Sequence, residues 1–182
     1  MTKHFRGAAA LLAALLLAAL LPATTACKRP DVRTVETIEE APRLASTVHV
    51  GDRAVASQLT SGFYDVEANA WRWTEQRFAV TLRPPVHAAE QGAVLELHLT
   101  VPPPSIAKLG TMALSASIGG VALAPETYTK AGDYTYRRAV PANLLAGDAV
   151  RIDFQLDKAM PPGDVDKREL GVVVSSAGLV SK

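Results

Sequence analysis

The chain has 182 residues, of which 48% are hydrophobic and 20% charged, and its formal net charge at pH 7 is +1. A chain of this length favours one domain with a sizeable hydrophobic core. The near-zero charge and the absence of a basic run argue against a nucleic acid as partner, and the sequence has no repeats typical of a fibre or stalk.

The first 26 residues have the organisation of an export signal. Lys3 and Arg6 give a basic start, and the apolar run from Ala8 to Leu21 follows without a polar residue. This run is shorter than the about 20 residues that span a bilayer, and it is typical of the helical core of a signal peptide. We therefore predict a signal peptide over residues 1–26.

Cys27 is the only cysteine of the chain, so it cannot form an internal disulfide. The segment LPATTAC, which ends at Cys27, resembles a bacterial lipobox, in which the cysteine is acylated and becomes the new N-terminus. The resemblance implies an exported lipoprotein anchored in a membrane and facing the periplasm or the cell surface, and Lys28 is compatible with the outer membrane. Thr24 stands where the family usually has Leu, so a secreted protein with a free thiol is the alternative.

The segment after the signal is expected to be a tether. Residues 27–45 begin at the lipidated cysteine, are charged, and contain Pro30 and Pro42. They lack sustained hydrophobic periodicity, as a flexible linker does. Such a linker would hold the following domain away from the membrane surface.

Residues 46–182 have the pattern of β-strands. Apolar and polar residues alternate with a period of two over 95–101, 112–118 and 150–156. Gly119-Gly120 predicts a tight hairpin and Ala131-Gly132-Asp133 a second turn, while the prolines at 102–104 and 161–162 predict connections. No helix of useful length is expected after residue 45.

The whole pattern predicts an all-β fold. We count about eight or nine short strands at spacings of roughly 8–15 residues, close to the pattern of an antiparallel sandwich. Two facing antiparallel sheets arranged as a jelly roll are therefore the expected architecture, and a β-barrel is the alternative.

Two short motifs bracket this region. Gly62-Phe63-Tyr64, Glu67 and Trp71-Arg72-Trp73-Thr74 open it, and MPPGDVDKRELGVVV, from Met160 to Val174, closes it. Together they resemble a β-sandwich domain of bacterial envelope proteins that occurs alone or appended to membrane glycosyltransferases. The resemblance covers roughly residues 58–182, and it implies a galactose-binding-like jelly roll without supplying catalytic residues.

The opening motif holds both tryptophans of the chain. Trp71 and Trp73 are two apart, so on a strand they share one face while Arg72 takes the other. In one interpretation the indoles are a platform that stacks on sugar rings, with neighbouring acids binding hydroxyls. In the other they close one end of the core, and Arg72 pairs with Glu67 or Asp166. The candidate ligand-binding residues are Tyr64, Glu67, Trp71, Arg72, Trp73 and Arg168.

Arg168 of the closing motif has two interpretations as well. It lies close to Asp164 and Asp166, which favours a bidentate structural clamp, and the alternative is a site for an anionic sugar or a carboxylate. The two aspartates alone are a weak calcium signal, and the histidines have no metal-ligand spacing. We therefore expect no metal and no cofactor.

These patterns predict a non-catalytic, lipid-anchored β-sandwich binding module of the cell envelope. A glycan or glycolipid is the first candidate ligand, by analogy at the level of the fold. The alternative is a scaffold or assembly lipoprotein that docks an envelope protein, such as a glycosyltransferase or export machinery. No nucleophile elbow and no phosphate-binding loop is present, and no carboxylate pair stands out, so we expect no enzymatic activity.

Overall fold

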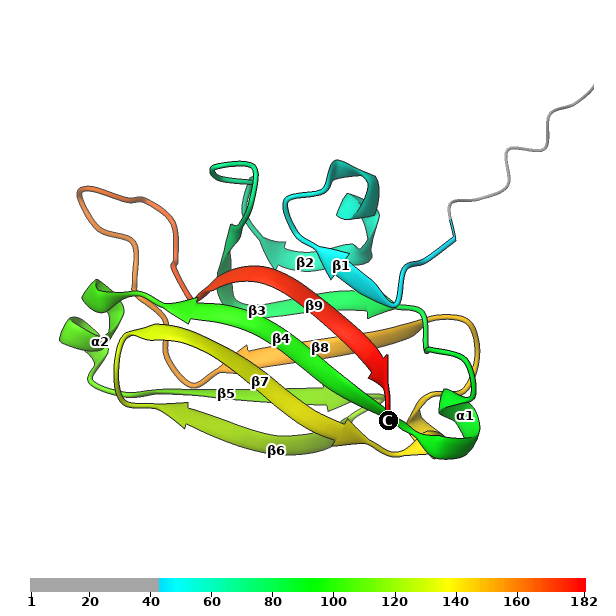
Figure 1. Ribbon diagram of the computed structural model, residues 1–182. Helices are drawn as coiled ribbons and strands as arrows, with labels where there is room; N and C mark the ends of the chain where they lie inside the picture. Colours follow the sequence, from blue (N-terminus) through cyan, green and yellow to red (C-terminus); the bar gives the residue numbers. More distant parts are fainter. Residues whose placement is uncertain (1–42) are drawn as a thin grey trace, which may run out of the picture. The chain divides into compact units, whose positions relative to one another are not determined.

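The computed structural model describes residues 43–182, which form two facing β-sheets (Figure 1). The predicted signal peptide, Cys27 and the tether up to residue 42 lie outside the described residues. Ala45, the last residue of the predicted tether, exchanges two hydrogen bonds with Gln58 and packs against the core. Residues 43–182 contain no helix with the length and apolar character needed to cross a membrane.

The described residues contain nine strands joined by short helices and loops. The strands are β1 (Thr47–His49), β2 (Leu59–Phe63), β3 (Arg72–Leu82), β4 (Ala93–Val101), β5 (Met112–Ile118), β6 (Val121–Tyr128), β7 (Gly132–Val140), β8 (Val150–Leu156) and β9 (Val173–Ser181). The helical turns are η1 (Arg53–Gln58), α1 (Ala88–Gln91), α2 (Pro103–Leu109) and η2 (Ala142–Leu144).

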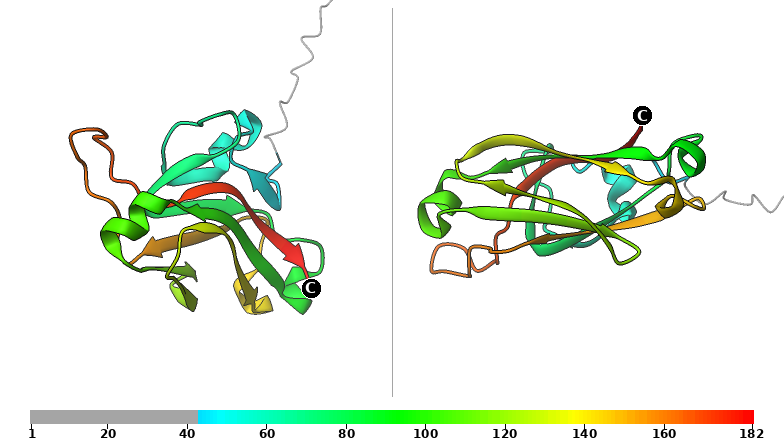
Figure 2. Two further views of the ribbon diagram at one scale, coloured as in Figure 1. Left: turned by 60° about the vertical axis from the view of Figure 1, so that its left-hand side comes forward. Right: turned by 90° about the horizontal axis from the view of Figure 1, so that it is seen from below.

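All strand pairs are antiparallel, and they divide into two layers (Figure 2). Sheet A contains β1, β9, β4 and β7, and sheet B contains β2, β3, β8, β5 and β6. The chain passes from one sheet to the other at nearly every connection after β3, as in a jelly roll. The predicted antiparallel sandwich is confirmed. The order of paired strands in the described residues ends at β6 and β7, so the sheet does not close into a barrel.

Strand β3 belongs to both sheets. Its first residues, Arg72 and Trp73, pair with Val174 and Val173 of β9 in sheet A. From Arg77 onward the same strand pairs with β8 in sheet B. The strand that carries the tryptophan motif therefore lies where the two layers join.

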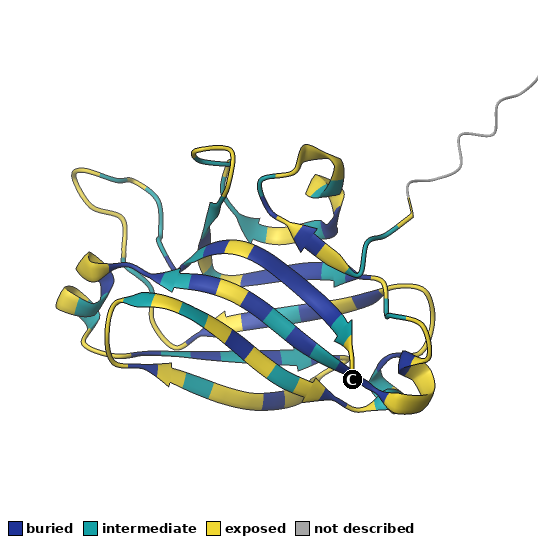
Figure 3. Cartoon of the chain, viewed as in Figure 1, coloured by how far each residue is buried: buried dark blue, intermediate teal, exposed yellow. Residues whose placement is uncertain are grey.

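The core lies between the sheets and follows the predicted alternation (Figure 3). Strands β5 and β8 have the bounds predicted from their period of two, and β4 begins two residues earlier than predicted. Phe78 and Phe154 stack with ring centroids 4.9 Å apart, and the edge of Tyr136 packs against Phe154. Buried aromatic rings of this kind supply much of the stabilising contact area of a small domain.

The turn residues behave as predicted at three places. Gly119 and Gly120 have φ of 56° and 82° and close the β5–β6 hairpin, which requires residues that accept positive φ. The prolines at 102–104 and 161–162 lie in connections. The predicted turn at 131–133 lies slightly earlier, because Gly132 already begins β7.

The helical turns were not expected from the sequence. Helix α2 begins on Pro103 and Pro104, whose fixed φ suits the first turn of a helix, and it ends after seven residues at Gly110. Each of these turns is too short to produce a readable helical period.

Candidate functional site

The two tryptophans lie at the start of β3, and both side chains are half-buried. Neither belongs to the hydrophobic core or to the partly buried residues that pack against it. Trp71 forms an isolated bridge with Glu67, and the Trp73 carbonyl accepts a hydrogen bond of 3.0 Å from the Tyr64 amide. The indoles therefore do not close one end of the core, in contrast to the second interpretation of the sequence.

Arg72 takes the other face of the strand, together with the fully buried Thr74. Its guanidinium donates to two backbone carbonyls, from Nε to Val50 at 2.8 Å and from Nη1 to Tyr64 at 2.9 Å. The predicted pairing of Arg72 with Glu67 or Asp166 is wrong. The physical reason is the alternation of β3, which directs Arg72 towards carbonyls that would otherwise lack a donor.

Arg168 makes the ion pairs that the sequence analysis assigned to Arg72. Its Nη1 contacts Glu67 Oε1 at 2.9 Å and its Nη2 contacts Asp166 Oδ2 at 2.8 Å. The guanidinium also lies over the Tyr64 ring, 5.2 Å from the centroid. The predicted clamp with Asp166 is confirmed, whereas Asp164 is exposed and lies 3.8 Å from Lys167 instead.

The electrostatics of this clamp follow from its hydrogen bonds. Those donated by Arg168 hold the pKa of Asp166 below its ordinary value, and the two carboxylates raise the pKa of Arg168. Partial burial, followed by the charges of Glu75 and Glu169, raises the pKa of Tyr64. The cluster therefore presents a neutral tyrosine and an arginine that stays charged.

Backbone contacts join the opening and closing motifs around this clamp. The Glu169 carboxylate accepts a hydrogen bond of 2.8 Å from the backbone N–H of Gln76. Thr74 Oγ1 accepts one of 3.1 Å from the backbone N–H of Val172. Of the six candidate residues, the structure brings Tyr64, Glu67 and Arg168 into direct contact. Arg72 touches this group only through the Tyr64 carbonyl, and the indoles lie on the outward face of the adjoining strand.

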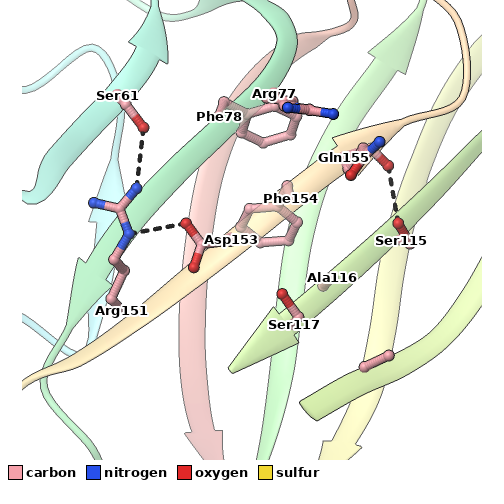
Figure 4. Close-up of a pocket in the computed structure, with 11 residues that line it drawn as sticks. Ser61, Arg77, Phe78, Ser115, Ala116, Ser117, Arg151, Asp153, Phe154 and Gln155 are labelled. Carbon is pink, nitrogen blue, oxygen red and sulfur yellow. Dashed lines mark hydrogen bonds and ion pairs between the residues drawn. The ribbon is translucent and has the colours of Figure 1, made fainter. Parts of the chain in front are cut away.

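Sequence reasoning missed a groove on the outer face of sheet B. It has a volume of about 420 Å³ and lies across β3, β8 and β5 (Figure 4). Arg77, Arg151, Asp153 and Gln155 line it with the short side chains of β5. The alternation of 150–156 identifies the outward residues, but the sequence does not reveal that β8 lies between β3 and β5.

The described residues define a nine-stranded antiparallel β-sandwich with an aromatic corner and a polar groove. No protein-family model matches the chain, and a search of curated proteins found no match. Among solved structures, a carbohydrate-binding module studied for its specific mannan recognition, TmCBM27, is similar over 76% of this chain and 97% of its own, with 12% identity and a TM-score of 0.44. A likeness of this size says nothing about the ligand of this chain.

Proposed function

We propose that the chain is an exported, lipid-anchored and non-catalytic β-sandwich that binds a glycan or glycolipid at the cell envelope. The signal pattern and the lipobox-like segment ending at Cys27 support export and anchoring. One observation supports glycan binding above all others: Trp71 and Trp73 are only partly buried, on one face of the chain at the start of β3, outside the core.

The chemistry of the indoles fits this role. No hydrogen bond involves either indole N–H within residues 43–182, although tryptophans usually find a partner for this donor when buried. A flat apolar ring with a free donor suits the face of a pyranose together with one of its hydroxyls. The exposed carboxylate of Glu75 lies on the same face of β3 and can accept from further hydroxyls.

The segments around the tryptophans are joined by side-chain contacts. The Arg168 clamp fixes the segment between β2 and β3 to the segment between β8 and β9 through Glu67 and Asp166. A platform that is already ordered loses little conformational entropy when a ligand binds, which favours affinity.

Other functions have less support from the described residues. The groove on sheet B has one carboxylate, Asp153, which is bonded to Arg151 at 2.8 Å, whereas hydrolysis of a glycosidic bond uses two. The large hydrophobic side chains that are exposed in residues 43–182 are Val86, Val121 and Val165, in three separate segments. Isolated valines do not make the apolar patch expected of a scaffold that docks a protein.

Tryptophan fluorescence tests the proposal directly, because the two indoles are the only tryptophans in the chain. The full chain in detergent would be titrated with neutral oligosaccharides of galactose, mannose and glucose. We expect a saturable emission change and protection from iodide quenching with at least one of them. Trp71→Ala and Trp73→Ala should each weaken binding, measured by calorimetry, about tenfold or more.

Val86→Ala is the matched control, since Val86 is 80% exposed and belongs to a different segment. It should leave both the affinity and the emission change unaltered. Indoles that are inaccessible to iodide, or a glycan affinity that survives both tryptophan substitutions, would contradict the proposed site.

A further inference from the structure

The groove on sheet B is built from two rows of outward side chains. In one row Arg77 faces Gln155 across β3 and β8, and Gln155 faces Ser115 across β8 and β5. In the next row Asp153 faces Ser117. Neighbouring strands lie about 4.8 Å apart, so each row presents polar groups at a regular spacing along the outer face of the sheet.

The hollow arises from a difference in side-chain length. Ser115 and Ser117 on β5 and Ala122 on β6 are short, whereas the flanking residues of β3 and β8 are long. The aromatic residues beneath, Phe78 and Phe154, are each 1% exposed and cannot stack on a ligand. The groove therefore offers hydroxyl, amide and charged groups, unlike the tryptophan corner.

The two arginines of the groove differ in how far a neighbouring group compensates their charge. Arg151 is held by Asp153 at 2.8 Å and by longer contacts to Thr60 and Ser61. Arg77 is exposed, and no hydrogen bond or ion pair involves its side chain within residues 43–182. Figure 4 shows its guanidinium at one end of the groove, beside Gln155. The groove thus contains one compensated arginine and one that is available to an anion.

We propose that this groove binds a carboxylated sugar of an acidic polysaccharide. The Arg77 guanidinium pairs with the sugar carboxylate in the bidentate manner that this group favours, and Gln155, Asp153 and Ser117 bind ring hydroxyls. The volume of about 420 Å³ falls within the range of small-ligand sites. This site goes beyond the tryptophan platform and does not depend on it.

An acidic saccharide fits better than an acidic peptide. The backbone groups of β8 and β5 are already paired with each other and with β3 and β6, so a peptide cannot add to them as a further strand. The floor of the groove consists mainly of short serine and alanine side chains. Hydroxyl-rich ligands make better use of these serine and amide groups.

The test uses calorimetry with the full chain in detergent at low salt and three probes. These are an oligogalacturonate, the same oligosaccharide with its carboxyls reduced, and poly-glutamate of similar charge. We expect oligogalacturonate to bind and the reduced form to bind at least about tenfold more weakly, since it lacks the charge-assisted contact. Poly-glutamate should bind no better than the reduced form.

Three variants locate the site. Arg77→Gln should weaken oligogalacturonate binding about tenfold or more, and Ser117→Gln should weaken it by filling the floor. Arg137→Gln is the matched control, because it removes the same charge from the outer face of sheet A. It should change the affinity less than twofold, and a urea denaturation curve would show that each variant is folded.

Several results would overturn this proposal. They are equal binding of the reduced oligosaccharide, binding of poly-glutamate that depends on Arg77, equal losses in Arg77→Gln and Arg137→Gln, and no binding of oligogalacturonate. Trp71→Ala should leave oligogalacturonate binding intact. The two sites can therefore fail separately, since neutral glycans test the tryptophan platform and the acidic probe tests the groove.

Discussion

Tyr128 and Tyr136 are both fully buried, yet their hydroxyl groups differ. The Tyr136 hydroxyl donates to the Ala124 carbonyl at 2.8 Å, whereas the Tyr128 hydroxyl is a buried polar atom without a partner in the described structure. Burial raises the pKa of both, so both remain neutral. The ring of Tyr128 packs against Tyr134 with centroids 4.6 Å apart, so the ring contributes packing although its hydroxyl is unsatisfied.

We predict opposite effects when each hydroxyl is removed. Tyr128→Phe should raise the free energy of unfolding by about 1 kcal/mol, because it removes a buried polar group that has no hydrogen bond. Tyr136→Phe should lower it by about 1 kcal/mol, because it removes a hydrogen bond from the buried hydroxyl to the Ala124 carbonyl, which then keeps only the one donated by Arg138. Urea denaturation measures both changes. Destabilisation by Tyr128→Phe would mean that its hydroxyl does have a partner, such as a bound water.

At the scale of the element, the β2–β3 pair is interrupted in a way that shapes both candidate sites. Ser61 is opposite Ala79, but Phe63, two residues later, is opposite Thr74. Gly62 lies in this irregular stretch with φ of 70°, and its backbone approaches β3 closely. The mismatch leaves Glu75, beside the tryptophans, and Arg77, in the groove, outside the pairing with β2.

Gly62→Ala should therefore be severely destabilising. A Cβ at this position would overlap the Arg77 carbonyl oxygen and lie 2.7 Å from Phe78 Cα. Strain from positive φ and overpacking together should cost about 3 kcal/mol or more. Gly119→Ala is the control, with φ of 56° and open space around the added methyl, and should cost about 1 kcal/mol. Thermal denaturation compares them, and equal losses would show that the close approach is unimportant.

The strands were predictable because one face of each is buried, which imposes a period of two on 112–118 and 150–156. Contacts between distant segments could not be predicted from this periodicity. Arg168 and Glu67 are separated by 101 positions, and several acids were equally available to either arginine. The groove depends on the order β3–β8–β5, which periodicity does not reveal. The partial burial of the tryptophans depends on the path of β3 between the sheets, which is another property of the topology.

At the scale of the whole molecule, the Arg168 clamp joins the opening of the domain to its end. Glu67 comes before β3, and Asp166 and Arg168 come before β9. Because the pKa of Asp166 is lowered in the folded state, this carboxylate stabilises the fold above the ordinary Asp pKa. The stabilisation is lost as the pH falls through the lowered value.

We expect this carboxylate to contribute to acid stability. Urea midpoints of the wild type and Asp166→Asn should differ by a constant amount from about pH 7 to about pH 5, and the difference should shrink below about pH 4. Asp164→Asn is the control, since Asp164 is fully exposed and lies 3.8 Å from Lys167, and it should show little difference at any pH. A difference between wild type and Asp166→Asn that does not change with pH would refute the role of this carboxylate.

The position of β9 determines when sheet A can fold during synthesis of the chain. This strand, the last in the sequence of the described domain, lies in the middle of sheet A, with β4 on one side and β1 and β3 on the other. Sheet A cannot assemble completely before residues 173–181 have left the ribosome. Until then its earlier strands lack their central partner. Late assembly of this kind would suit a chain that, as we propose, crosses a membrane before it folds.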